Sequence, residues 1–118
     1  MKTDRELLEL AAKAAGLEFY LDSLCGGPEL ALDGMRIIGL CLANGGVWNP
    51  LTDDGDALRL AVNLRIVVDV TPWATDAHHW HNKRSDDSGI RHLEYNDPYA
   101  ATRRAIVRAA AAIGESMP

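Results

Sequence analysis

The segment Trp48–Leu64 constrains this chain more than any other, because it joins a tight loop to a strongly amphipathic run. Pro50 keeps Asn49 out of the helical region of backbone space, so the chain has to turn before a helix can begin. Trp48 stands just before this turn, and we expect its ring to anchor the loop on a sheet. The pattern predicts a structural loop motif, formed by Trp48, Asn49, Pro50 and Asp53, that leads directly into a helix.

Acidic residues crowd the predicted start of that helix and allow two interpretations. Thr52 or Asp53 can cap the helix, and Asp53, Asp54 and Asp56 place negative charge at the positive end of its dipole. Three carboxylates can also bind a divalent cation, but the ligand spacing and the distal Glu of a calcium loop are missing here. We therefore favour the structural interpretation. The helix carries an apolar stripe at helical spacing, formed by Ala57, Leu58, Leu60, Ala61, Val62 and Leu64.

Two further helices are predicted at the ends of the chain. Thr3 begins a capping box before an apolar stripe, which indicates a helix over residues 4–15. Asp97 caps the last helix, which we expect to run to about Ile113, with Gly114 as its stop.

Short alternating or β-branched runs predict strands between these helices. The sequence Asp33-Gly34 is typical of a hairpin turn. Residues 73–96 are less regular, and we interpret 77–82 and 90–95 as the strands of a second hairpin. The other predicted strands are residues 17–21, 30–32, 35–42 and 65–70. The expected fold class is α/β: one domain over 1–118, with a small mixed or antiparallel β-sheet and helices packed on its faces, as an α-β-α layered sandwich.

Composition places the chain among ordinary globular proteins. Hydrophobic residues make up 47% of it and charged residues 25%, and the formal net charge is −5. That charge disfavours non-specific binding to nucleic acid or to an anionic membrane. No apolar run approaches the roughly 18–20 residues that span a bilayer, and the charged N-terminus does not resemble a signal peptide. We expect a cytoplasmic protein with no cofactor, in which Cys25 and Cys41 are buried thiols rather than a metal or redox motif.

The stretch from Asp76 to His81 contains the residues best suited to chemistry. On a strand, His79 and His81 would share one face and His78 the other, while His92 could lie across a hairpin. Imidazoles with a carboxylate can hold zinc or another transition metal, and histidine can act as a general base. No metal motif of defined spacing accompanies them, so partly exposed strand or loop residues are the more economical interpretation. The alternative metal set is Asp76, His78, His79 and His81.

Two other groups of residues are candidates for partner recognition. Arg103, Arg104 and Arg108 form a basic cluster on the last helix, which is either a solvated face with acidic partners or a phosphate-contacting surface. Aromatic residues are dense over residues 73–99, where Trp73 and Trp80 stand with Tyr95 and Tyr99. They either form a small aromatic core under the last helix or include exposed anchors for another chain.

Residues 48–61, WNPLTDDGDALRLA, and residues 97–110, DPYAATRRAIVRAA, resemble a pattern in small proteins of tailed phages and prophages. These proteins carry the phage ABA sandwich domain, and the resemblance extends over most of the chain except residues 22–46. It implies helices on both sides of a sheet and a viral origin. It implies no catalytic residues.

Three functional hypotheses follow. The first is a phage-encoded accessory protein, not an enzyme, that binds a host or phage protein, forms a homodimer, and counters a host process or defence. The alternative is a metal-dependent enzyme or small-ligand binder that uses the segment His78–His81. The third is nucleic-acid binding through the arginines of the last helix, which predicts affinity that falls steeply with salt.

Overall fold

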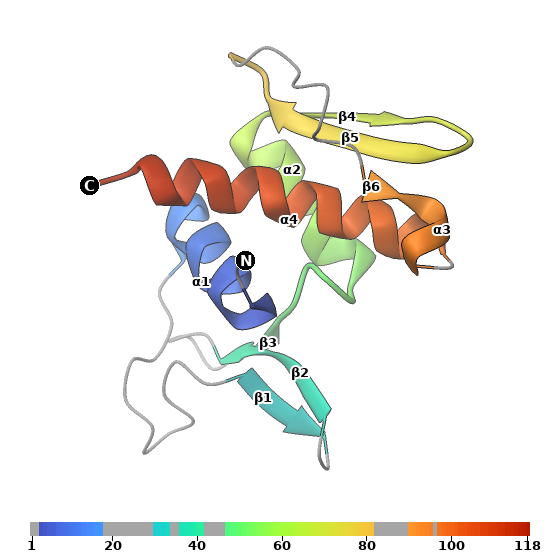
Figure 1. Ribbon diagram of the computed structural model, residues 1–118. Coiled ribbons are helices and arrows are strands. Elements are labelled where there is room, and N and C mark those ends of the chain that lie inside the picture. Colours follow the sequence, from blue (N-terminus) through green and yellow to red (C-terminus); the bar gives the residue numbers. More distant parts are fainter. Residues whose placement is uncertain (1–2, 18–29, 34–35, 42–46, 82–89, 96) are drawn as a thin grey trace.

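The longest described helix, α4 (Pro98–Ser116), runs through the middle of the molecule (Figure 1). The computed structural model describes residues 3–17, 30–33, 36–41, 47–81, 90–95 and 97–118. Helix α4 packs most extensively against α1 (Asp4–Ala15), and also against α2 (Asp54–Leu64) and strand β5 (Ala74–His79). None of the described helices is long and apolar enough to cross a membrane.

The described strands form two separate antiparallel sheets, which lie at opposite ends of the molecule (Figure 1). The first has the order β1-β2-β3 and the second has the order β4-β5-β6. Helices α2 and α4 pack against the second sheet, which confirms a mixed α/β fold with helices on a small antiparallel sheet. The sequence did not indicate the division into two sheets. The remaining elements are β1 (Leu30–Asp33), β2 (Arg36–Cys41), β3 (Val47–Trp48), β4 (Ile66–Val70), β6 (Ile90–Arg91) and α3 (His92–Tyr95).

The helix starts lie where local capping chemistry predicts them. Thr3 forms the capping box of α1, Asp53 is the N-cap of α2, and Asp97 is the N-cap of α4. Helix α1 ends at Gly16, whose φ of 74° allows its N–H to bond back to the last carbonyls of the helix. Helix α2 ends at Arg65, which has the same left-handed conformation with a φ of 57°. Because Arg65 is neither glycine nor asparagine, the sequence did not predict this helix end.

The predicted end of the last helix is wrong. Helix α4 continues to Ser116, and Gly114 is a buried residue inside it rather than its stop. A Cβ atom at Gly114 would overlap the backbone carbonyl of Leu10 in α1. Glycine is needed here because the two helix backbones approach closely. Its position near the C-terminus therefore does not mark the end of the helix.

The first predicted hairpin is confirmed. Strands β1 and β2 pair antiparallel with Asp33 opposite Arg36. The predicted strand 17–21 falls outside the described residues except for Leu17, which follows the end of α1. Cys41 ends strand β2, and Cys25 lies outside the described residues.

The second sheet holds the part of the molecule that bears on function. Strand β4 pairs with β5 along its whole length, from Ile66 opposite His79 to Val70 opposite Thr75. The strand predicted over 77–82 begins earlier, at Ala74, and ends at His79. Strand β6 pairs antiparallel with Ala74 and Thr75, which precede the predicted strand, so the register of the predicted hairpin is wrong. Residues 92–95 form the helical turn α3, so the strand predicted over 90–95 is correct only at its beginning.

The core is built largely from small side chains. Alanines make up half of the buried residues of α1 and most of those of α4, the two helices with the most extensive mutual contact. Leu8 and Val107 are among the largest fully buried side chains. The buried apolar residues are Leu7, Leu8, Ala11, Ala12, Trp48, Ala57, Leu60, Ala61, Ile66, Ala77, Ile90, Ala101, Ala105, Ile106, Val107, Ala110 and Ala111.

Candidate functional site

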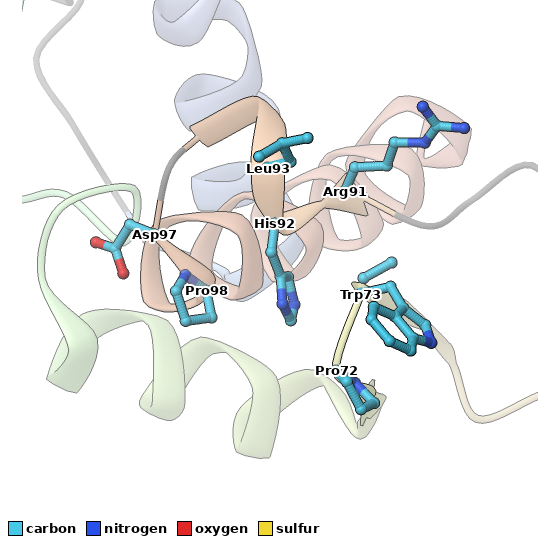
Figure 2. Close-up of a pocket in the computed structure, with 8 residues that line it drawn as sticks. Pro72, Trp73, Arg91, His92, Leu93, Asp97 and Pro98 are labelled. Carbon is cyan, nitrogen blue, oxygen red and sulfur yellow. The ribbon is translucent and has the colours of Figure 1, made fainter.

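A groove opens where the turn between β4 and β5 meets β6, α3 and the start of α4. Its volume is about 710 Å³. Figure 2 shows Pro72 and Trp73 on one side of this groove and Asp97 and Pro98 on the other, with His92 between them. We call it the Trp73 groove. It is lined by Pro72, Trp73, Ala74, Arg91, His92, Leu93, Asp97 and Pro98.

The backbone that carries Trp73 is held by hydrogen bonds on both sides. The hydroxyl of Thr71 accepts from the N–H of Ala74 at 3.1 Å and donates to the Ala74 carbonyl at 2.8 Å. The N–H of His92 donates to the Trp73 carbonyl at 3.0 Å, which joins the turn to α3. The indole therefore projects from a fixed backbone, and 79% of Trp73 is exposed.

A buried polar contact fixes the floor of the groove. The Thr75 hydroxyl lies 2.9 Å from Nε2 of His92 and 2.8 Å from the Thr102 hydroxyl, and Thr75 is fully buried. This arrangement ties β5, α3 and α4 together and orients the His92 ring. Because Thr75 is inaccessible, the contact is structural and does not present a nucleophile. The sequence indicates only that His92 could lie across a hairpin, and no residue pattern identifies Thr75 as its partner.

Most residues that line the Trp73 groove are apolar, and Arg91, His92 and Asp97 are its polar lining residues. Leu93 is 85% exposed, so the described residues cover little of this large apolar side chain. Arg91 is also exposed. Exposed tryptophan and leucine beside an arginine suit the binding of a protein segment that offers an apolar side chain and a carboxylate.

Trp80 is also exposed but does not line this groove. It follows the opposite end of β5, and 58% of it is accessible. Its ring lies 3.7 Å, centroid to centroid, from the ring of His81, which in turn lies 5.0 Å from that of His79. The two tryptophans proposed for partner recognition thus lie at separate ends of the strand.

The residues of the alternative metal site are spread over both faces of β5. Asp76 is buried and His78 half-buried on one face, and His79 is on the other by strand alternation. His81 lies beyond the end of the strand and is exposed. Within the described part of the chain, no three His, Cys, Asp or Glu side chains converge as metal ligands would. The geometry gives this alternative no support.

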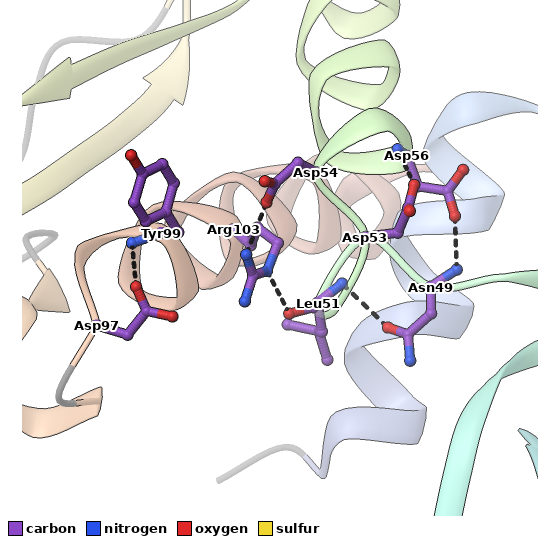
Figure 3. A network of polar contacts seen from close by, with 8 residues as sticks. All are labelled: Asn49, Leu51, Asp53, Asp54, Asp56, Asp97, Tyr99 and Arg103. Atoms are coloured by element: carbon purple, nitrogen blue, oxygen red, sulfur yellow. Dashed lines mark hydrogen bonds and ion pairs between the residues drawn. The ribbon is translucent and has the colours of Figure 1, made fainter. Parts of the chain in front are cut away.

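The arginines of α4 serve different contacts and do not form one basic surface. Arg103 donates to the Leu51 carbonyl at 2.8 Å and to Asp54 at 2.6 Å (Figure 3). Arg104 donates to Asp4 at 2.8 Å, which links α4 to the start of α1. Arg108 is exposed. Two of the three guanidinium groups therefore hold other elements against α4.

The loop motif before α2 is a network of internal hydrogen bonds (Figure 3). Asn49 is buried, and its side-chain oxygen accepts from the N–H of Leu51 at 3.0 Å. The N–H of Asn49 donates to Asp56 at 3.0 Å, and Asp53 accepts from the N–H of Asp56 at 2.8 Å. Trp48 and Pro50 are buried as well. These contacts agree with the structural interpretation of the motif.

Comparison with protein-family models, with curated proteins and with solved structures finds no match to this chain.

Proposed function

We propose that this chain is a binding protein, not an enzyme, and that it captures a segment of another protein in the Trp73 groove. The observation that supports this proposal is the exposure of Trp73 and Leu93 on a backbone that hydrogen bonds already hold in place. Tryptophan is among the residues that contribute most to protein–protein affinity. A rigid backbone lowers the ordering cost of association.

The class of partner follows from the chemistry of the groove. Apolar walls favour a partner segment with a large apolar side chain, and Arg91 at the rim favours a carboxylate close to it. The resemblance to phage ABA sandwich proteins supports a phage-encoded accessory role in the host cytoplasm. The proposed partner is then a host or phage protein, including a component of a host process or antiviral defence.

Site-specific photocrosslinking tests this proposal. A photoreactive phenylalanine derivative replaces Trp73 or Leu93, and a matched control carries it at Ala112, which is exposed on α4 far from the groove in sequence. In bacterial lysate we expect the same discrete partner to be attached at both groove positions and not at the control position. Identical adducts at all three positions, or none at the groove, would overturn the proposal.

A competition measurement quantifies the same interaction. The partner identified by crosslinking is purified, and its affinity is compared for the unmodified chain and for Trp73→Ala. Loss of a central aromatic anchor typically costs at least about 2 kcal/mol, so we expect affinity to fall by about thirtyfold or more. Equal affinity would show that the groove does not carry the binding.

A further inference from the structure

The imidazole rings of His79 and His81 lie beside each other at the end of β5. Their centroids are 5.0 Å apart, and the ring planes are tilted by 41° to each other. The two residues are separated by one position, and strand alternation places such side chains on the same side of the chain. His79 is half-buried and His81 is exposed, so solvent reaches both rings.

The backbone that carries the two histidines is held by the sheet. His79 lies opposite Ile66 in the pairing of β5 with β4. The N–H of Trp80, between the two histidines, donates to the Arg65 carbonyl at 3.1 Å. The Trp80 ring lies 3.7 Å from that of His81, centroid to centroid, and packs against it. The imidazoles are therefore close together before a ligand binds, which lowers the cost of ordering them.

The spacing of these two rings matches that of imidazoles bound to one metal ion. When two imidazoles bind an ion through nitrogens about 2 Å away, their centroids lie about 4.5–5.2 Å apart, for angles between the square-planar and tetrahedral values. The observed 5.0 Å falls within this range. Neither ring makes a hydrogen bond with another described residue, so binding breaks none of these. His92 differs, because its Nε2 already lies 2.9 Å from the Thr75 hydroxyl.

We propose that His79 and His81 together bind a late divalent transition-metal ion, such as Ni²⁺, Cu²⁺ or Zn²⁺. Imidazole suits these ions, whereas Mg²⁺ and Ca²⁺ prefer oxygen ligands. The second metal bond forms within one chain, so the pair binds more tightly than a single histidine. No third His, Cys, Asp or Glu joins the pair within the described part of the chain, so the ion takes its remaining ligands from solvent.

This two-histidine site is distinct from the four-residue set that the geometry does not support. It uses only the imidazoles that share one side of the chain, and it leaves out Asp76 and His78 on the other face. It is also independent of the Trp73 groove, because Trp73 precedes the opposite end of β5. His79→Gln is therefore expected to leave the partner adduct at position 73 unchanged.

Calorimetric titration with NiCl₂ tests the proposal. Ni²⁺ is the chosen probe because thiols such as Cys25 and Cys41 do not reduce it, and a pH of about 7.5 keeps protons from competing for imidazole. We expect one ion to bind per chain, and excess Mg²⁺ not to compete. His79→Gln and His81→Gln should each lower the affinity by at least about tenfold. His78→Gln is the matched control, because it removes an imidazole from the other face, and it should leave the affinity unchanged.

The double variant shows whether the two histidines act on one ion. If they do, His79→Gln with His81→Gln loses little more affinity than either single variant. Two ions per chain, with one lost in each single variant, would overturn the proposal, as would no saturable binding or equal losses from His78→Gln and His79→Gln. Circular dichroism checks that the variants fold. Should His79→Gln misfold, His81→Gln provides the test, because His81 is exposed beyond the end of β5.

The fluorescence of Trp80 reports where the ion binds. Ni²⁺ quenches an indole at short range, and the Trp80 ring is packed against His81. We expect Trp80→Phe to keep the calorimetric affinity and to lose most of the quenching, since Trp48 lies in the core and Trp73 at the other end of β5. Quenching of the same size in Trp80→Phe would place the ion elsewhere and overturn the proposal.

Discussion

Three neighbouring carboxylates before α2 have different surroundings, although the sequence makes them look equivalent. Asp56 accepts from the N–H of the buried Asn49 and pairs with Arg59 at 2.8 Å. Asp53 caps the helix by accepting from the N–H of Asp56. Asp54 is 70% exposed and meets Arg103. The role of each residue follows from the donor it satisfies and not from its charge.

Alanine at each of these three positions should therefore destabilise the protein to a different extent. Asp56→Ala leaves a buried backbone N–H without its acceptor, which costs about 1–3 kcal/mol. Asp53→Ala removes an N-cap, which costs about 1 kcal/mol. Asp54→Ala removes a largely exposed ion-pair partner, which costs less than about 1 kcal/mol. Urea unfolding measures the order, and equal losses at all three positions would contradict it.

The tryptophans show the same dependence on surroundings. Trp48 is 7% exposed and belongs to the core, whereas Trp73 projects from the molecule. We expect Trp48→Ala to cost about 3–5 kcal/mol of unfolding free energy, because it removes a buried aromatic ring. Trp73→Ala should change stability by no more than about 0.5 kcal/mol. Thermal unfolding compares the two, and a large loss from Trp73→Ala would mean that its ring packs in the fold.

At the scale of elements, the pairing of α1 with α4 sets the architecture. These helices make the largest contact between elements, and alanines and Gly114 line it. The carbonyl of Leu10 lies where a Cβ atom of residue 114 would be. Arg104 and Asp4 add an ion pair at the other end of the contact. Small residues along the seam thus allow the backbones to approach, and the charged pair aligns the ends.

Gly114→Ala should destabilise the protein even though alanine favours helices. The new methyl group forces α1 and α4 apart, and overpacking of this kind typically costs about 1–3 kcal/mol. A matched control is Ala112→Gly, at an exposed position of the same helix, where the loss is about 1 kcal/mol and comes from helix propensity alone. Guanidinium unfolding distinguishes them. A gain in stability from Gly114→Ala would show that the helices have room to adjust.

The sequence predicted the elements whose signals are local. The caps at Thr3 and Asp97 were correct, and Asp53 was one of two candidates with Thr52, because each cap satisfies an N–H group two or three residues away. The role of Gly114 was missed because it depends on α1, which is distant in sequence. The Trp73 groove could not be predicted either. It needs a turn, a short strand and two helices to meet, and the contact of Thr75 with His92 that holds them joins residues 17 positions apart.

At the scale of the whole molecule, two of the three arginines of α4 are engaged in ion pairs with other elements. The net charge is −5, and Arg103 and Arg104 are 16% and 20% exposed in their ion pairs with Asp54 and Asp4. A protein that binds nucleic acid without sequence preference needs several cations free to contact phosphates. In the described part of the last helix, Arg108 is the exposed arginine.

We therefore expect the chain not to retard duplex DNA or RNA in a gel at low salt, about 50 mM, where phosphate contacts are strongest. Asp4→Asn with Asp54→Asn is the informative comparison, because it removes the carboxylates that pair with Arg104 and Arg103 without altering α4 and lowers the negative charge. If only the double variant retards nucleic acid, and the retardation weakens as salt rises, the ion pairs prevent Arg103 and Arg104 from contacting phosphate. Retardation of the unmodified chain with the same salt dependence would instead establish a phosphate-contacting surface.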